Sequence, residues 1–319
     1  MRILNIDGTS LEVSAICLGN GFMKNKSEED RLALLDAYTN MGGNMVDSAL
    51  IYGYREETGT SASEAQLGRW MKSRGNRNRL VVTTKGAHPY PIGDPRMRLS
   101  REDIRADLEK SLKTLGTDFI DLYWLHRDDP ERDVAEILST MNELVREGRI
   151  RFFGCSNWAP SRIEEAAAYA FREGIRGFSA NQLSWSVARS IPAKLAINKL
   201  CTMDGEGWRY HRRTGLAVFA YSSQARGLFA RLETGSWETI PESYAQYDLS
   251  ENRPRIDILL SLAKKKGITP SQAAIAWLMA QPFTVIPIVG CGSQAHLEEA
   301  MKAADMALVR EEMEEIGLW

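Results

Sequence analysis

The sequence predicts a (β/α)8 TIM barrel, a fold of eight parallel strands each followed by a helix, preceded by an N-terminal β-hairpin. The chain of 319 residues is long enough for two domains or for one large fold around a single core. No low-complexity or Gly- and Pro-rich linker interrupts it, so we expect a single domain over residues 1–319. Short β-branched runs alternate with longer helical patterns, which is typical of βα units around a parallel sheet.

Eight short apolar runs are the predicted strands of this barrel. They cover residues 13–18, 44–47, 80–85, 119–125, 150–155, 178–182, 216–221 and 285–289. A hairpin pattern at residues 2–9, with the turn pair Asp7-Gly8, precedes the first of them. A doubly wound α/β sheet is the alternative fold, and it usually carries a Gly-rich fingerprint after its first strand. Because Gly19-Asn20-Gly21 does not continue to a third glycine, the barrel is favoured.

Helical patterns lie between and after these strands. They cover residues 27–41, 63–72, 100–115, 134–147, 161–173, part of 193–213, 255–266, 271–280 and 294–302. The first begins with Ser27 at the N-cap and with Asp30 as its capping-box partner. Glu28 and Glu29 place negative charge at the positive end of the helix dipole.

Composition and charge exclude several classes of protein. The 44% hydrophobic and 26% charged fractions are typical of a globular chain and argue against disorder. A net charge of -2 and a pI near 6.2 give no basic footprint for nucleic acid. No apolar run approaches the ~20 residues that span a bilayer, and residues 1–7 lack the apolar core of a secretory signal. We therefore expect a cytoplasmic protein with no membrane partner. Since its four cysteines form no CxxC pair, we expect reduced thiols and no metal site.

Polar side chains stand at the carboxyl ends of the predicted strands, where a barrel of this kind carries its site. Asp47 ends the second strand, and Tyr52 follows it in the next loop. Lys85 ends the third strand and His126 the fourth. An unpaired charge at a buried strand end is strongly unfavourable. Four ionisable groups at the same end of the barrel therefore indicate a catalytic site.

Four motifs carry a resemblance to a known family. They are residues 47–53 (DSALIYG), 84–86 (TKG), 125–126 (LH) and 154–158 (GCSNW), in this order. Together they resemble the aldo-keto reductases, and the likeness covers nearly the whole chain. The resemblance implies a (β/α)8 barrel that binds a nicotinamide dinucleotide in extended form, without a Rossmann domain, and reduces carbonyl groups.

Carbonyl reduction needs a hydride at carbon and a proton for the developing alkoxide, and Tyr52 is the candidate proton donor. A phenol with an ordinary pKa of about 10 holds its proton tightly and needs a neighbouring cation, which Lys85 supplies. Asp47, paired with Lys85, holds the ammonium in place and keeps it charged. His126 hydrogen-bonds the substrate oxygen or assists proton relay. The family resemblance implies the same roles.

The resemblance also assigns residues to the nicotinamide end of the cofactor. Ser156 and Asn157 match the pair that hydrogen-bonds the carboxamide, and Gln182 matches the residue that completes this contact. Tyr221 matches the aromatic residue that stacks on the nicotinamide ring. The Gly19-Asn20-Gly21 segment lets the backbone approach the same side.

Two further loops match the rest of the cofactor site. The loop after the seventh strand contacts pyrophosphate, with Arg226 or Arg231 as its predicted cation. Its matching residues are Ser222, Ser223, Gln224, Arg226 and Gly227. The loop after the eighth strand matches the adenosine-phosphate site, which leads into a helix N-terminus. Its matching residues are Gly290, Gly292, His296 and Glu299.

The adenosine loop departs from the family pattern in two places. Gly292 stands where the family often has an Arg or Ser that contacts the 2'-phosphate. Ala300 replaces the Asn of a Glu-Asn pair that grips adenine, and His296 stands where the family has Arg or Gln. We expect NADP(H) as the cofactor on family frequency, with NAD(H) as the alternative.

A small-molecule carbonyl compound is the predicted partner, while the oligomeric state is not predicted. Aromatic side chains are expected at the pocket mouth, which suits small apolar or sugar-like carbonyls. They are Phe22, Tyr52, His88, Tyr90 and Trp158, together with Trp185, for which ordinary packing is the favoured interpretation.

Three other functions compete with carbonyl reduction. A Schiff-base aldolase would use Lys85, but it would not need Ser156, Asn157, Gln182 or the loop at Gly290. A non-catalytic dinucleotide-binding sensor subunit would retain all of these residues. A metal-dependent hydrolase agrees least with the sequence, because no further His or acidic residue stands at metal-ligand spacing from His126 and Asp47.

Overall fold

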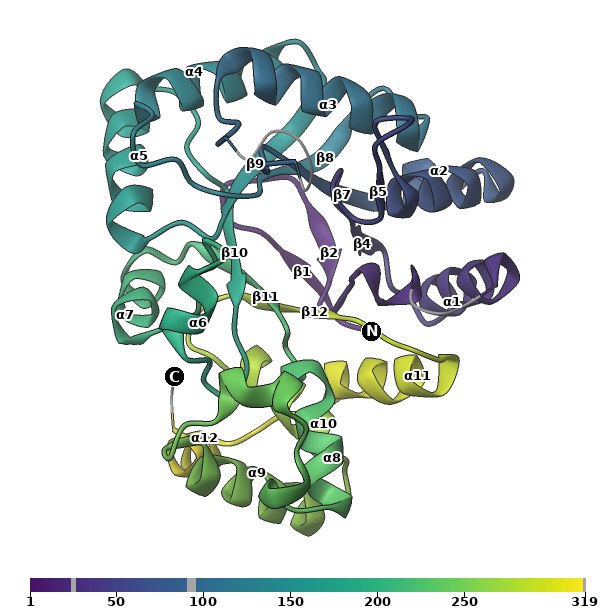
Figure 1. Ribbon diagram of the computed structural model, residues 1–319, viewed down its shortest axis with the longest axis vertical. Coiled ribbons are helices and arrows are strands. Elements are labelled where there is room, and N and C mark those ends of the chain that lie inside the picture. Colours follow the sequence, from purple (N-terminus) through teal and green to yellow (C-terminus); the bar gives the residue numbers. More distant parts are fainter. Residues whose placement is uncertain (24–26, 91–95, 318–319) are drawn as a thin grey trace.

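Eight parallel strands close into a barrel in the computed structural model of the chain, which describes residues 1–23, 27–90 and 96–317 (Figure 1). In order around the barrel they are β3 (Cys17–Leu18), β4 (Met45–Asp47), β7 (Val81–Gly86), β8 (Ile120–Leu125), β9 (Ile150–Ser156), β10 (Ala180–Ser184), β11 (Ala217–Tyr221) and β12 (Val285–Val289). The ring closes where β12 pairs with β3. The structure therefore confirms the predicted (β/α)8 TIM barrel.

An antiparallel hairpin at the N-terminus closes one end of the barrel. Its strands are β1 (Ile3–Asn5) and β2 (Glu12–Ser14). Leu11 and Val13 are buried in the same cluster as Trp124 of the barrel interior, and Figure 1 shows the hairpin lying across the barrel. Because β2 leads directly into β3, the hairpin covers the amino ends of the strands, and the carboxyl ends stay open.

The prediction of one strand over residues 13–18 is wrong, because the structure divides this segment between β2 and the barrel strand β3. The Ser14 hydroxyl donates to the Ile16 carbonyl at 2.9 Å, and the Asn44 side chain accepts from the Ser14 amide at 2.7 Å. These side-chain bonds occupy backbone groups that a continuous strand would pair with its neighbour. Gly8 of the predicted turn does lie in the hairpin loop, at φ 71°, a left-handed conformation that favours glycine.

Helices cover the outside of the barrel close to their predicted positions. They are α1 (Glu28–Asn40), α2 (Ala62–Arg74), α3 (Arg101–Leu115), α4 (Val134–Arg146), α5 (Pro160–Glu173), α7 (Gly205–Thr214), α9 (Asn252–Lys266), α10 (Pro270–Met279) and α11 (Gln294–Lys302). The Ser27 side chain accepts from the Asp30 amide, as its predicted N-cap role requires.

Several shorter elements were not predicted. They are helices α6 (Pro192–Ala196), α8 (Leu228–Thr234) and α12 (Arg310–Ile316), strands β5 (Tyr54–Arg55) and β6 (Thr60–Ser61), and the 3-10 turns η1 (Asn20–Met23), η2 (Arg77–Arg79), η3 (Ala225–Gly227), η4 (Trp237–Thr239), η5 (Glu242–Tyr247) and η6 (Ala303–Asp305). The single helix predicted within residues 193–213 is in fact two, α6 and α7. The second begins anew because the Asp204 side chain accepts from the Gly207 amide and caps it.

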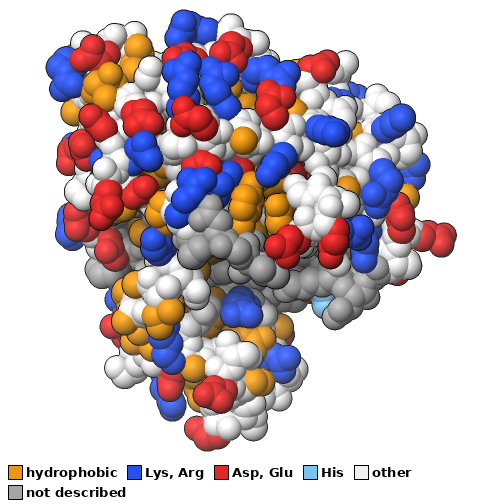
Figure 2. All heavy atoms as spheres, turned by 45° about the horizontal axis from the view of Figure 1, so that its top comes forward, with side chains coloured by type: hydrophobic (Ala, Val, Ile, Leu, Met, Phe, Trp, Pro, Cys, Tyr) orange, Lys and Arg blue, Asp and Glu red, His pale blue; other side chains and the backbone are white. Residues whose placement is uncertain are grey.

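Charges of both signs are interspersed over the face that carries α3 and α4 (Figure 2). Arg105 of α3 pairs with Glu143 at 2.9 Å and with Glu147 at 2.7 Å. Exposed pairs of this kind contribute at most about 1 kcal/mol each. Within residues 1–23, 27–90 and 96–317, no helix is both long and apolar enough to cross a bilayer.

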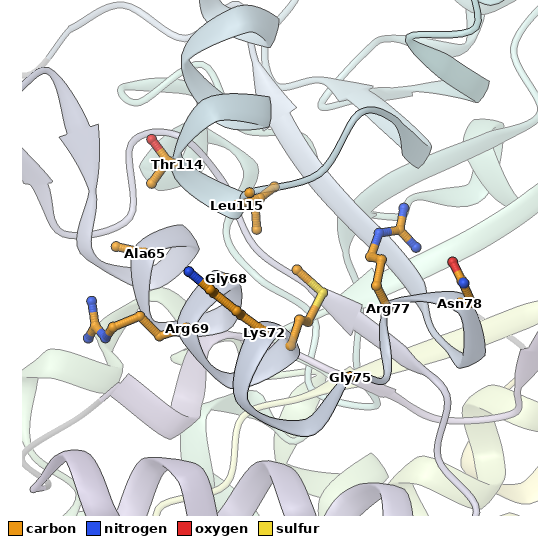
Figure 3. A pocket seen from close by; sticks show the side chains of 11 residues that line it. Ala65, Gly68, Arg69, Lys72, Gly75, Arg77, Asn78, Thr114 and Leu115 are labelled. Carbon is orange, nitrogen blue, oxygen red and sulfur yellow. The ribbon is translucent and has the colours of Figure 1, made fainter.

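A hollow of about 560 Å³ lies between α2 and α3 (Figure 3). Its lining includes Lys72 and Gly75 at the end of α2 and Thr114 and Leu115 at the end of α3. In this barrel the helices run antiparallel to the strands, so their last turns lie away from the strand carboxyl ends. The hollow is therefore remote from the rim where the predicted site residues stand.

A carboxyl group is buried between α2 and β7. Glu64 is 0% exposed, and its Oε1 accepts from the Thr84 hydroxyl at 2.5 Å. Its Oε2 has no hydrogen-bond partner among the described residues. Burial raises the pKa of Glu64 to about 7, and the nearby charge of Asp107 adds to the rise. The folded protein therefore retains a proton here that an unfolded Glu, with a pKa of about 4.3, releases.

We expect Glu64→Gln to stabilise the protein at neutral and alkaline pH. Because the folded-state pKa lies above the unfolded one, the wild-type protein loses stability as the pH rises from roughly 4.5 to 7. The amide does not ionise, so the gain over wild type approaches about 4 kcal/mol above pH 7 and vanishes in acid, at about 1.4 kcal/mol per pKa unit. Urea unfolding across this pH range measures it. The exposed Glu57→Gln is the control, and parallel pH profiles for wild type and E64Q would contradict the buried ionisation.

Candidate active site

A cavity of about 940 Å³ opens at the carboxyl ends of the barrel strands. The predicted catalytic and cofactor residues line it, except Lys85, Arg231 and Gly292. Those that line it are Gly19, Asn20, Gly21, Asp47, Tyr52, His126, Ser156, Asn157, Gln182, Tyr221, Ser222, Ser223, Gln224, Arg226, Gly227, Gly290, His296 and Glu299. The fold brings them together because parallel strands end at one rim. Lys85 lies just behind this lining, and Gly292 is exposed in the loop before α11.

A buried ion pair forms the floor of the cavity. Lys85 at the end of β7 donates through Nζ to Asp47 Oδ2 at 2.5 Å and to the Ser48 carbonyl at 2.7 Å. The other carboxylate oxygen of Asp47 accepts from the Thr83 hydroxyl at 2.6 Å and from Gln182 Nε2 at 3.3 Å. Both charges are thus paired and further hydrogen-bonded, as a buried pair requires.

The ammonium of Lys85 is held in its charged form. Burial, the largest influence, lowers the pKa of Lys85, but the neighbouring Asp47 and Tyr52 outweigh it and leave the pKa above its ordinary value. Lys85 Nζ lies 4.9 Å from the centroid of the Tyr52 ring. A fixed positive charge therefore stands beside the phenol.

Tyr52 is positioned by a small sheet that the sequence did not predict. Its loop after β4 ends in the β5–β6 pair, and the buried Ser61 starts α2 directly after β6. The Ser61 hydroxyl lies 2.9 Å from the Ala49 carbonyl and 2.8 Å from the Tyr52 carbonyl. The same hydroxyl accepts from the Glu64 amide as the N-cap of α2. The start of α2 therefore fixes the backbone that carries the phenol.

His126, directly after β8, is the fourth ionisable residue of the site, beside Asp47, Lys85 and Tyr52. Its ring stands edge-on to Tyr52, with centroids 5.8 Å apart. Burial holds the pKa of His126 well below its ordinary value, and the charges of Arg127, Lys85 and His88 lower it further. Its Nδ1 is buried without a partner among the described residues, which leaves Nε2 as the nitrogen that reaches the cavity. His126 is therefore a neutral hydrogen-bonding group at pH 7.

The residues predicted to contact the nicotinamide carboxamide are not equally available. Asn157 donates through Nδ2 to Ser156 Oγ at 3.0 Å and to the His126 carbonyl at 3.2 Å. Its Oδ1 accepts from the Tyr221 hydroxyl at 2.7 Å and from the Cys201 amide at 3.1 Å. Both ends of the Asn157 amide are thus engaged within the protein. Asn157 orients its neighbours, while the Ser156 hydroxyl proton and Gln182 Oε1 stay available to a ligand.

The loop after β11 holds strained backbone at the side of the cavity. Ser222, Ala225 and Arg226 have φ values of 55°, 46° and 59°, a region that non-glycine residues rarely adopt. Strain of this kind costs about 1–3 kcal/mol per residue and clusters at ligand sites. Arg226 is exposed and lines the cavity. Arg231, the other candidate for the pyrophosphate, instead donates to the Tyr244 hydroxyl at 3.0 Å.

The two loops at the far side of the cavity approach each other closely. A Cβ added to Gly21 would lie 2.5 Å from Gly290 Cα, so this approach requires glycine. Ser293 caps α11 by accepting from the His296 amide at 3.2 Å. Glu299 Oε1 accepts from the Thr269 hydroxyl at 2.6 Å. Of the described residues, none of those lining this side is a lysine or arginine.

Part of the predicted aromatic mouth is wrong. Trp158 is buried against Phe178, with ring centroids 4.9 Å apart, and Trp185 packs on Trp277 at 5.6 Å. Neither tryptophan lines the cavity, and nor does Tyr90. His88 and Tyr52 do line it, and the side chain of Phe22 lies outside the described residues.

The sequence analysis missed several lining residues. They are Ile51, Arg127, Leu200, Ala230, Ser271, Ile288 and Cys291. Arg127 directly follows His126 at a strand end, but this position alone does not predict its burial.

Comparison with known proteins identifies the family of the chain. The sequence model of the aldo/keto reductase family matches residues 15–317. The chain belongs to the aldo/keto reductase family.

Individual aldo/keto reductases resemble the chain over nearly its whole length. It is 30% identical over 304 residues to the aldo-keto reductase str7 of Strobilurus tenacellus, covering 90% of this chain and 80% of that protein. It is 29% identical over 318 residues to the uncharacterized oxidoreductase YrpG of Bacillus subtilis, covering 98% and 93%. A solved thermostable aldo-keto reductase in complex with the inhibitor epalrestat superposes with a TM-score of 0.73 at 26% identity, covering 99% of this chain and 98% of that one.

Two rival chemistries fit this aldo/keto reductase barrel poorly. A Schiff-base lysine must lose its proton to attack a carbonyl, whereas the pKa of Lys85 is raised and its ammonium is hydrogen-bonded. In the part of the chain that the structure describes, no three His, Cys, Asp or Glu side chains gather closely enough to hold a metal ion.

Proposed function

We propose that the protein reduces aldehydes and ketones to alcohols with NADPH or NADH as the hydride donor. One observation carries the proposal: the buried Lys85–Asp47 pair lies beside Tyr52, which faces the same cavity as His126. A phenol next to a fixed cation, with a second hydrogen-bonding group nearby, suits a carbonyl oxygen that gains negative charge. Membership of the aldo/keto reductase family supports the same reaction class. A cytoplasmic location stays a prediction from the sequence.

Each of the four groups has a distinct role in this proposal. Tyr52 gives its hydroxyl proton to the carbonyl oxygen, and the ammonium of Lys85 stabilises the phenolate that is left. Asp47 keeps that ammonium charged and in place. His126, neutral and with Nε2 toward the cavity, donates a hydrogen bond that orients the carbonyl oxygen. The bound dinucleotide supplies the hydride to the carbonyl carbon.

The cavity lining fits an extended nicotinamide dinucleotide. The Ser156 hydroxyl and Gln182 Oε1 offer one donor and one acceptor to a carboxamide, and the Tyr221 ring lies at the same end. Arg226 and the strained backbone around it would hold the pyrophosphate. The capped start of α11 would face the adenosine side. Asn157 is proposed to orient this site rather than to touch the cofactor.

A panel of aldehydes and ketones with NADPH and NADH tests the proposal. Consumption of reduced cofactor, followed optically, is the expected result for several aldehydes. Quenching of tryptophan fluorescence measures cofactor binding separately. A folded protein that binds the dinucleotide and turns over no carbonyl compound would favour the non-catalytic sensor instead.

We expect Gly292→Arg to raise the affinity for NADPH relative to NADH about tenfold or more. No lysine or arginine among the described residues lines the adenosine side, and the carboxylate of Glu299 does. A Cβ at Gly292 meets only His296 Nδ1, at 3.9 Å, so a side chain fits there. A guanidinium at this position supplies a charge-assisted bond to the 2'-phosphate that distinguishes NADPH.

Fluorescence titration of both cofactors measures this change, with Gly292→Gln as the neutral control of similar length. An equal change for NADPH and NADH in G292R would place Gly292 away from the 2'-phosphate. A strong NADPH preference already present in the wild type would mean that another group binds this phosphate.

A further inference from the structure

A buried arginine lines the cavity without a carboxylate partner. Arg127 is 8% exposed and follows His126 at the end of β8. Its Nη1 donates to the His126 carbonyl at 2.9 Å, and its Nε donates to the Asn198 carbonyl at 3.2 Å. Burial lowers the pKa of Arg127, and among the described residues only Tyr221, Tyr52 and Cys201 oppose this. No Asp or Glu of the described chain balances its charge.

Two other arginines with little solvent exposure are balanced by carboxylates. Arg98 pairs with Asp103 at 2.9 Å and with Asp107 at 2.7 Å. Arg77 pairs with Asp121 at 2.9 Å. An uncompensated buried charge is strongly unfavourable. Its retention at Arg127 indicates an anion that comes from outside the chain.

One edge of the Arg127 guanidinium is free to meet that anion. Nη2 has no hydrogen-bond partner among the described residues, and it is not one of the polar atoms sealed from solvent. Arg127 lines the cavity and its Nη2 is not sealed from solvent, so we infer that this edge faces the cavity. The two hydrogens of Nη2 and the second hydrogen of Nη1 stay available, which suits a carboxylate in a forked, two-bond contact.

The neighbours of Arg127 leave its charge dominant in this part of the cavity. His88 lies with its ring centroid 4.8 Å from that of His126, and burial and the charge of Arg127 lower its pKa to about 4. His88 and His126 are therefore neutral at pH 7. Asp47, an acidic residue that lines the cavity with Tyr52, is already paired with Lys85. Nothing described at this end of the cavity repels an anion.

We propose that the substrate is a carbonyl compound that also carries a carboxylate, which Arg127 binds while the carbonyl oxygen lies between Tyr52 and His126. This inference rests on the proposed function and adds the substrate class. The contact through the His126 carbonyl ties the guanidinium to the segment that carries the imidazole. The residue that binds the carboxylate and the residue that orients the carbonyl group are therefore adjacent at the end of β8.

Matched aldehydes test this inference. The pairs are 4-carboxybenzaldehyde with 4-methylbenzaldehyde and succinic semialdehyde with butanal, which cover two lengths between carbonyl and charge. For wild type we expect kcat/KM for the carboxylate-bearing aldehyde to exceed that for its uncharged partner by about tenfold or more in at least one pair. A charge-assisted hydrogen bond contributes a free energy of this size. Arg127→Met keeps the apolar stem and should bring this ratio close to one. Arg127→Lys should restore part of it, and Arg132→Met, in the same loop but paired with Glu136, should leave the ratio unchanged.

Binding of benzoate gives a readout that does not need turnover. In the complex with NADP(H), wild type should bind benzoate at least about tenfold more tightly than R127M, measured by tryptophan quenching. Equal binding, or equal ratios in both pairs for wild type and R127M, would overturn the inference. So would a loss of NADP(H) affinity in R127M with unchanged ratios, which would assign Arg127 to a cofactor phosphate. Turnover of no aldehyde, together with Arg127-dependent benzoate binding, would reject the proposed reaction but keep the anion site.

Discussion

Tyr52→Phe should lower kcat for aldehyde reduction by about 10²–10⁴, the range that a positioned general acid contributes. The variant loses only the hydroxyl, so the ring keeps its contacts with Lys85 and His126. The Tyr52 ring stands beside both the buried ammonium and the imidazole, where its hydroxyl can serve as the proton donor. We therefore expect the loss in kcat, with little change in cofactor affinity. Single-turnover reduction with preloaded cofactor measures the step directly.

The matched control for this variant is Tyr244→Phe. It also removes a phenol hydroxyl from the cavity lining, but this hydroxyl donates to the Arg226 carbonyl in the loop after β11. It should alter cofactor affinity more than the reduction step. Activity of Tyr52→Phe within a factor of about three of wild type would remove the general-acid assignment, since the missing proton would then come from elsewhere.

The strand-end residues could be predicted because topology alone brings them together. Once the chain forms a closed parallel barrel, Asp47, Lys85 and His126 end neighbouring strands and must meet at one rim. No knowledge of side-chain packing is needed for that step. The same holds for Ser156 and Gln182, which pair directly across β9 and β10.

Side-chain direction after a strand end could not be predicted in this way. Asn157 has a positive φ of 63°, and the turn it makes directs Trp158 back onto Phe178 instead of into the cavity. Alternation along a strand says nothing about a residue beyond such a turn. The hydrogen bonds that occupy the Asn157 side-chain oxygen could not be predicted either. They come from Cys201 and Tyr221, which are remote from Asn157 in the sequence.

Arg127 was missed because its burial depends on a contact remote in sequence. An arginine after a strand end is typical of a solvent-exposed loop. The Asn198 carbonyl, which lies 71 residues further along the chain, accepts from its Nε and helps to enclose it. A charged residue indicates a functional site when it is buried, and the sequence pattern did not predict that Arg127 is buried.

Lys85→Met should both unfold the protein more easily and abolish most of its activity. It leaves the Asp47 carboxylate buried at 3% exposure, with Thr83 and Gln182 as its remaining partners among the described residues. Breaking a buried ion pair from one side costs about 3–5 kcal/mol. Reduction should also slow by about 10²–10⁴, because the phenolate of Tyr52 loses its cation.

The double variant Asp47→Asn with Lys85→Met separates these two effects. It removes both charges together, so most of the lost stability should return, because no unpaired charge is left in the barrel. Activity should stay low, since neither side chain then supplies a cation beside Tyr52. Urea unfolding and single-turnover reduction on the two single variants and the double variant complete the cycle. If the double variant regained activity together with stability, the ion pair would serve the fold alone, and the proton donor would need no cation at its side.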